Sequence, residues 1–222
     1  MGGGKSLELI IFDIYYYFQL YFKMVEKNEI TNNVLNRFKR EDLKSIDKLD
    51  EIISLIDVVE KIFYTDYSAE RNNLLKKEIL NSIKILDEYL SNINILCKAE
   101  VSFIYFCKSF LLDRLPEYSK VAEDSATKSL KLNPFIADSY NCIAHIIWKK
   151  GDVNLALNYF TQALQIDNKN KITLRNLSMI VRARKSDNIN EKTKWSEESV
   201  QYAKLAVDLD IKDADSWCKI KI

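Results

Sequence analysis

The stretch ADSYNCIAHIIWKKGDVNLALNYFTQALQIDN, residues 137–168, decides the fold of this chain. Its apolar side chains recur at spacings of three and four residues, which is typical of helices with one buried face. Gly151 interrupts the pattern near its centre, where a tight turn requires a conformationally permissive residue. Small Ala144 and Ala156 stand on either side of that turn and allow two helices to approach closely. The stretch therefore predicts a hairpin of two packed helices.

The same pattern recurs along the chain with a period of 34 residues. At this spacing Ala122 is followed by Ala156, and Ser129 is followed by Ala163. In the middle copy, Tyr140, Ile143, Ala144, Ile147, Ala156, Phe160 and Ala163 match the pattern W-x2-L-G-x2-Y followed by A-x3-F-x2-A. A sustained period of 34 residues with this pattern is typical of the tetratricopeptide repeat (TPR), a helix–turn–helix unit.

Composition favours an all-α protein. The 222 residues include only four glycines and two prolines, and three of the glycines stand in the opening MGGGKS. A sheet protein of this size would need more turn-forming residues. The net charge of +1 provides no basic field for nucleic acid, so we expect no direct DNA binding. The most apolar run, Leu7–Phe22, contains charges and is shorter than the roughly 20 residues of a membrane span, so no membrane association is expected.

Two further helices are predicted before the repeats. Apolar residues spaced by three and four run from Leu43 to Phe63 and again from Leu74 to Ile93. We assign residues 43–97 to this antiparallel helical pair.

The remaining residues fall into a leader and a repeat array. Residues 1–42 are interpreted as a poorly ordered or misassigned leader, and Met24 is the predicted natural start. Residues 98–222 are assigned to a TPR array of about three repeats plus the start of a fourth at Trp217. A terminal repeat normally carries a polar capping helix, so we expect an array truncated at its C-terminal end.

Two local expectations concern a loop and the cysteines. The last repeat returns after 43 rather than 34 residues, and we predict that the extra residues form a polar loop within KSDNINEKTKW, residues 185–195. The four cysteines form no CxxC pair and fall on apolar helix faces, which predicts buried thiols rather than metal or disulfide roles. No metal or cofactor is expected.

Candidate binding residues follow from the geometry of TPR arrays, whose first helices line a concave face that binds peptides. The residues expected there include Asn141, Trp148, Arg175 and Arg182, with Lys108 comparable in the earliest copy. Two guanidinium groups seven residues apart, together with Lys108, favour a peptide that carries carboxylates. The asparagine amide can hold an extended peptide backbone.

Each of these residues also has a purely structural interpretation. Arg182 stands near the end of a helix, where a cation complements the helix dipole. Trp148 can pack against a neighbouring helix, and His145 is interpreted as a packed or surface residue rather than a catalyst. No nucleophile–histidine–carboxylate set and no phosphate-binding loop is present in the sequence pattern, so we predict that the protein is not an enzyme and has no small-molecule substrate.

Several longer stretches are similar to the tetratricopeptide repeat protein 5 (Strap) family, and the resemblance covers residues 49–217. The most specific stretches are WKKGDV (148–153), RNLSMIVR (175–182), SVQYAKLAVDLDIKDADSW (199–217), KLNP (131–134) and EYSKVAEDS (117–125). The resemblance implies an adaptor that recognises the N-terminal peptide of nascent tubulin at the ribosome and triggers decay of tubulin messenger RNA. Arg182 matches the family's peptide-binding arginine, and Lys131 and Asn141 match its ribosome-facing or peptide-facing surface.

Three interpretations of function follow. The leading one is a cytoplasmic TPR adaptor for a tubulin-like N-terminal peptide. The second is a nuclear scaffold for a stress-response transcription coactivator, which the same family resemblance implies. The third is a truncated fragment without independent activity.

Overall fold

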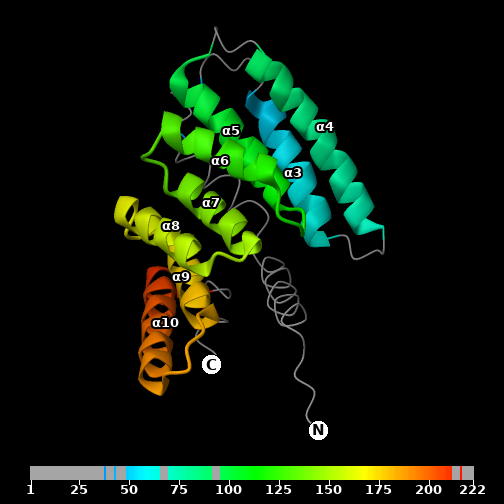
Figure 1. Ribbon diagram of the computed structural model, residues 1–222. Coiled ribbons are helices and arrows are strands. Elements are labelled where there is room, and N and C mark those ends of the chain that lie inside the picture. The colour runs from blue at the N-terminus through cyan, green and yellow to red at the C-terminus, as the bar shows by residue number, and fades with distance from the viewer. Residues whose placement is uncertain are drawn as a thin grey trace.

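A computed structural model shows the chain as a stack of helical hairpins (Figure 1). The structure describes residues 49–65, 70–91 and 96–211, together with Phe38, Leu43 and Ser216. These residues form eight helices and no strand, which confirms the all-α class. The helices are α3 (Leu49–Thr65), α4 (Arg71–Ser91), α5 (Lys98–Asp113), α6 (Lys120–Leu132), α7 (Ala137–Lys150), α8 (Val153–Ile166), α9 (Lys171–Ala183) and α10 (Ile189–Leu209).

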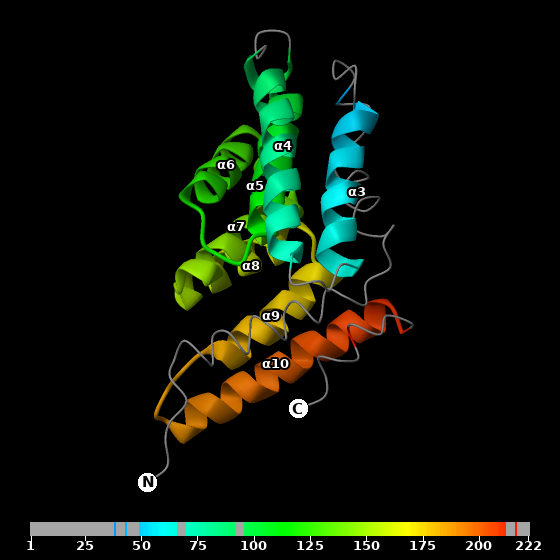
Figure 2. The ribbon, with the colours of Figure 1, turned by 90° about the vertical axis from the view of Figure 1, so that its right-hand side faces the viewer.

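The helices pair in chain order and each pair stacks on the next. Within the array, α5 packs on α6, α7 on α8 and α9 on α10, while α6 contacts α7 and α8 contacts α9. Figure 2 shows α9 and α10 lying side by side at one end of the stack. This is the TPR-like arrangement that the period of 34 residues predicts. The predicted antiparallel pair α3–α4 joins it in the same way, because α4 packs against α5.

Small residues lie where the paired helices approach most closely. Ala144 on α7 and Ala156 on α8 are fully buried, and Phe160 fills the space beside them with 0% exposure. In the last hairpin the two corresponding positions hold Ser178 and Ser199. The Ser199 hydroxyl donates to the Ser178 carbonyl oxygen at 2.8 Å, so the substitution keeps close packing and satisfies the added polar groups.

The turn between α7 and α8 uses its glycine in a left-handed conformation. Gly151 has φ = 97°, and its N–H donates to the Trp148 carbonyl oxygen at 2.9 Å. The Asp152 N–H donates to the Ile147 carbonyl oxygen at 3.3 Å, and the Asp152 carboxylate then accepts the Leu155 N–H at 3.0 Å. Helix α7 therefore ends, and α8 begins, within two residues.

Replacing Gly151 with alanine is expected to lower the free energy of unfolding by about 1 kcal/mol, because an alanine Cβ clashes with the backbone at this φ. A Cβ built at Gly151 meets no other atom within 4 Å, so the cost comes from the backbone conformation alone. Urea unfolding followed by circular dichroism measures the change. Gly151→Asn, which tolerates this conformation, should lose less, and an equal loss for both variants would contradict the explanation.

The predicted loop at residues 185–195 is wrong in extent. Helix α10 begins at Ile189, so most of the extra residues form its first turns. The Asn188 side chain accepts the Asn190 N–H at 2.9 Å at the start of this helix, and the Arg184 guanidinium lies 4.1 Å from the centre of the Trp195 ring. A capping asparagine and a stacked arginine therefore favour helix where a polar sequence suggests a loop.

The cysteine prediction is correct for two residues and wrong for one. Cys107 and Cys142 are buried, and burial raises the pKa of both thiols, that of Cys142 to about 12. Cys97 is exposed because it precedes the first turn of α5, where its backbone N–H donates to the Glu100 carboxylate at 2.7 Å. Cys218 lies outside the described residues.

Most of the predicted leader, residues 1–42, and most of the predicted fourth repeat lie outside the described residues. One residue of the leader that the structure does describe, Phe38, is buried. Its ring centre lies 5.1 Å from that of Phe103 and 5.2 Å from that of Phe106, both on α5. Phe38 therefore contributes to the same hydrophobic core as the repeats.

Two ion pairs, one buried and one partly buried, connect the first helices of successive hairpins. The Arg114 guanidinium, just after α5, pairs with Glu60 on α3, and both side chains are 6% exposed. The Lys149 ammonium on α7 lies 2.7 Å from the Asp113 carboxylate and donates to the Leu115 carbonyl oxygen at 3.0 Å. Both pairs join at the C-terminal end of α5, where cations also complement the helix dipole.

Candidate peptide-binding surface

Arg182 is one of the two exposed cations among the predicted site residues. It lies in the last turn of α9 and is exposed. Its guanidinium bonds within its own helix, with Nε donating to the Ser178 carbonyl oxygen at 3.3 Å and Nη2 contacting the Ser178 hydroxyl at 3.4 Å. A guanidinium carries five N–H donors, so these contacts hold the side chain in place and leave donors for a carboxylate.

Arg175 and Asn141 lie deeper, and each is only 5% exposed. The Asn141 amide on α7 exchanges two hydrogen bonds with the Thr173 hydroxyl on α9, at 2.9 and 3.1 Å. Thr173 in turn donates its N–H to the Asn170 side chain, which caps α9, at 3.0 Å. In this structure the amide that was predicted to hold a peptide backbone instead joins two successive repeats.

The two aromatic groups of α7 pack on α8. The Trp148 ring meets Phe160 edge to face, with ring centres 6.5 Å apart, and His145 meets the same phenylalanine at 5.3 Å. The interpretation of His145 as a packed residue is therefore confirmed. Burial lowers the pKa of His145 from 6.5 to about 4, so the imidazole is neutral at physiological pH.

The neutral His145 makes stability depend on pH. In the unfolded chain it binds a proton near pH 6.5, whereas the folded protein does so only near pH 4. Its contribution is therefore fully present above pH 6.5 and is lost as the pH falls towards 4. We expect a loss of about 1–2 kcal/mol between pH 7 and pH 5, measured by urea unfolding. His145→Gln should remove this part of the pH dependence, and an unchanged dependence would contradict it.

The two predicted lysines lie apart from α9. Lys108 on α5 is 13% exposed and pairs with Asp87 on α4 at 2.5 Å, in a pocket formed by α4, α5 and α6. Lys131 is exposed in the last turn of α6. The structure therefore brings together Asn141 and Thr173 on neighbouring helices, but it does not place Lys108 beside the arginines of α9.

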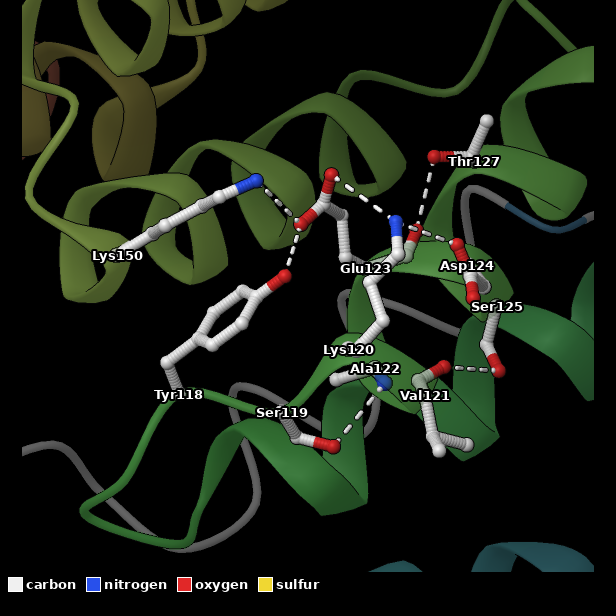
Figure 3. Close-up of polar contacts among 10 residues, drawn as sticks. All are labelled: Tyr118, Ser119, Lys120, Val121, Ala122, Glu123, Asp124, Ser125, Thr127 and Lys150. Atoms are coloured by element: carbon white, nitrogen blue, oxygen red, sulfur yellow. Dashed lines mark hydrogen bonds and ion pairs between the residues drawn. The ribbon is translucent and has the colours of Figure 1, made fainter.

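A polar cluster that the sequence patterns did not identify joins α6 to the end of α7 (Figure 3). The Glu123 carboxylate accepts the Tyr118 hydroxyl at 2.5 Å and the Lys150 ammonium at 3.2 Å, and it lies 3.5 Å from the Lys120 ammonium. The phenol hydrogen bond raises the pKa of Tyr118 and lowers that of Glu123. Lys150, from the stretch WKKGDV, therefore contacts Glu123, from the stretch EYSKVAEDS, although the two residues are 27 positions apart in the sequence.

Among the residues that the structure describes, no group of three or more histidine, cysteine, aspartate or glutamate side chains could hold a metal ion. Within the same residues, none of the helices is both long and apolar enough to cross a bilayer.

The stacked hairpins and their small-residue contacts define a TPR-like helical repeat protein. The chain is similar to tetratricopeptide repeat protein 5 of Bos taurus, with 42% identity over 106 residues, and to the proteins of that name from Homo sapiens and Mus musculus, each with 40% identity over 106 and 110 residues. No family model matches the chain.

The similarity to tetratricopeptide repeat protein 5 confirms the resemblance seen in the sequence. The matches cover 48–50% of this chain, less than the 49–217 range that the motifs suggested. The chain spans about a quarter of the length of the curated relatives that it matches, 24–25%.

Proposed function

We propose that this chain is a non-catalytic adaptor that binds a short acidic peptide on the surface formed by α7 and α9. By its resemblance to tetratricopeptide repeat protein 5, the peptide is the N-terminus of nascent tubulin at the ribosome, and the process is the autoregulation of tubulin messenger RNA in the cytoplasm. The observation that supports the proposal is the partly exposed side chain of Arg182, whose guanidinium bonds to Ser178 through two of its five N–H donors.

The neighbouring residues have supporting roles in this proposal. Arg175 lies two turns before Arg182 on α9 and adds a second positive charge beneath the surface. The hydrogen bonds between Asn141 and Thr173 fix α9 against α7, so the position of Arg182 is set by the stacking of two repeats. Trp148, packed on Phe160, supplies a rigid aromatic surface on α7, and Lys131 on α6 adds charge for the ribosome.

Replacing Arg182 with alanine is expected to weaken binding of a fluorescent Met-Arg-Glu-Ile peptide about tenfold, because a charge-assisted pair with the peptide glutamate is lost. Fluorescence anisotropy titration measures the dissociation constant of the parent and the variant. A peptide with glutamine in place of glutamate should bind the parent weakly and should be insensitive to the substitution.

Lys185→Ala is the matched control, because Lys185 is an exposed cation three residues further along the chain. It removes the same charge and should leave the affinity nearly unchanged. Equal binding by the parent and Arg182→Ala would show that the peptide does not use α9. Failure of all variants to bind would favour a fragment without independent activity.

A further inference from the structure

The pocket that contains Lys108 lies between the helical pair and the first repeat, and its lining residues come from α4, α5 and α6. It has a volume of about 430 Å³, and α5, which contributes to its lining, packs against both α4 and α6 (Figure 1). Its lining residues are Asp87, Leu90, Ser91, Tyr105, Lys108, Val121, Asp124, Ser125 and Lys128. A volume of this size accommodates a small ligand or one or two residues of a peptide.

Two of the four charged groups that line the pocket are neutralised by each other, and a third has a partner nearby. The Lys108 ammonium pairs with the Asp87 carboxylate at 2.5 Å. Asp124 pairs with Lys120, one turn before it on α6, at 2.9 Å. Among the described residues, the ammonium of Lys128 is the lining charge for which no carboxylate partner is present. The pocket therefore offers one cation to a ligand.

A hydrogen-bond donor lies beside that cation. The Lys128 ammonium is 5.1 Å from the centre of the Tyr105 ring, a cation–π contact that holds it over the pocket wall. Within the described part of the chain, the Tyr105 hydroxyl makes no hydrogen bond. Tyr105 on α5 and Lys128 on α6 therefore line the same pocket from two helices that pack against each other.

Two apolar side chains, Val121 and Leu90, also line the pocket. Val121 is 54% exposed although it lines the pocket, and Leu90 of α4 also contributes to the lining. Figure 3 shows Val121, Asp124 and Ser125 on the side of α6 that faces away from Tyr118 and Lys150. The Ser125 hydroxyl already donates to the Val121 carbonyl oxygen at 2.8 Å, so it can only accept a further bond from a ligand.

We propose that this pocket binds a carboxylate carried on a short apolar body, as found at the C-terminus or in an acidic side chain of a peptide. The carboxylate accepts from the Lys128 ammonium and the Tyr105 hydroxyl, and the apolar part covers Val121 and Leu90. A dianionic phosphate is disfavoured, because the carboxylates of Asp87 and Asp124 line the same pocket and one free cation cannot neutralise two charges.

The test is an NMR titration of the whole ¹⁵N-labelled chain with two matched probe pairs. N-acetyl-leucine is compared with N-acetyl-leucinamide, which represents a peptide C-terminus with and without its charge. N-acetyl-glutamate amide is compared with N-acetyl-glutamine amide, which represents the side chain. We expect the acid of at least one pair to bind at least fivefold tighter than its uncharged partner, with shifts confined to α4, α5 and α6, and the tighter pair identifies the source.

Three variants locate the contacts. Lys128→Ala should weaken binding of the acid about fivefold, and Tyr105→Phe about threefold, since each removes one donor while the wall remains. Lys84→Ala removes an exposed cation of α4 that does not line the pocket, and it should leave the affinity unchanged. Circular dichroism checks that all three remain folded. Equal affinity for acid and amide in both pairs, or full binding by Lys128→Ala, would overturn the proposal.

Discussion

Replacing Phe160 with alanine is expected to lower the free energy of unfolding by about 3–5 kcal/mol, one of the two largest effects of a single substitution that we predict. Phe160 is 0% exposed at the centre of the α7–α8 hairpin, where His145 and Trp148 both meet its ring edge to face. Removal of the ring deletes these contacts and leaves a cavity, because the surrounding helices are held by their own packing. Urea unfolding followed by circular dichroism measures the loss.

A matched substitution on α8 distinguishes the loss of stability caused by the cavity from a loss that any substitution in this helix would cause. Leu155 lies on the same helix and is 39% exposed, so Leu155→Ala should cost less than about 1 kcal/mol. The Phe160→Ala variant has a second readout, because hydration of the cavity should move the pKa of His145 from about 4 back towards 6.5. Similar losses for the two variants would show that the ring is not central to the hairpin.

Replacing Arg114 with alanine is expected to cost a similar amount, about 3–5 kcal/mol, for an electrostatic reason. The guanidinium pairs with Glu60 and lies 4.1 Å from the centre of the Phe110 ring and 5.4 Å from that of Phe63. Its loss would leave the Glu60 carboxylate buried without its cation, and desolvation of an unpaired charge is strongly unfavourable.

The double variant Arg114→Met with Glu60→Leu tests this reason. Both charges are then replaced by apolar groups, so the double variant should be more stable than Arg114→Ala, although it carries one more substitution. Thermal and urea unfolding of the single and double variants give the coupling between the two sites. A double variant that is less stable than Arg114→Ala would show that the ion pair is not the source of the loss.

The sequence predicts the repeat architecture well because its decisive residues act locally. Ala144, Ala156 and Phe160 are spaced by the geometry of a hairpin, and Gly151 marks a turn that few other residues accept. The predicted loop at residues 185–195 is wrong because a polar sequence indicates that residues are exposed to solvent, and exposed residues can belong to a helix as well as to a loop. Exposed lysines and glutamates form helix once Asn188 caps them.

The candidate site was less predictable, because helical spacing gives the direction of a side chain but not its neighbours. Helical spacing predicts that Asn141 faces a ligand, but its amide is hydrogen-bonded to the Thr173 hydroxyl of the next repeat. Helical spacing groups Lys108 with the arginines of α9, but in the structure Lys108 pairs with Asp87 on α4. One feature of the sequence does point to the pocket. Its lining residues on α6 are spaced so that they share one face of the helix, and they are Val121, Asp124, Ser125 and Lys128.

The paired charges at the end of α5 have a consequence for how the stack opens. A repeat array behaves as a line of units coupled to their nearest neighbours. Glu60 with Arg114, and Asp113 with Lys149, link α3, α5 and α7 through two successive ion pairs, so these three hairpins should unfold as a single cooperative block. The α9–α10 hairpin joins the same hydrophobic core, because α9 packs on α8 and the Asn141 amide bonds to Thr173. The position of Arg182 on α9 therefore depends on how this last hairpin packs against the rest of the array.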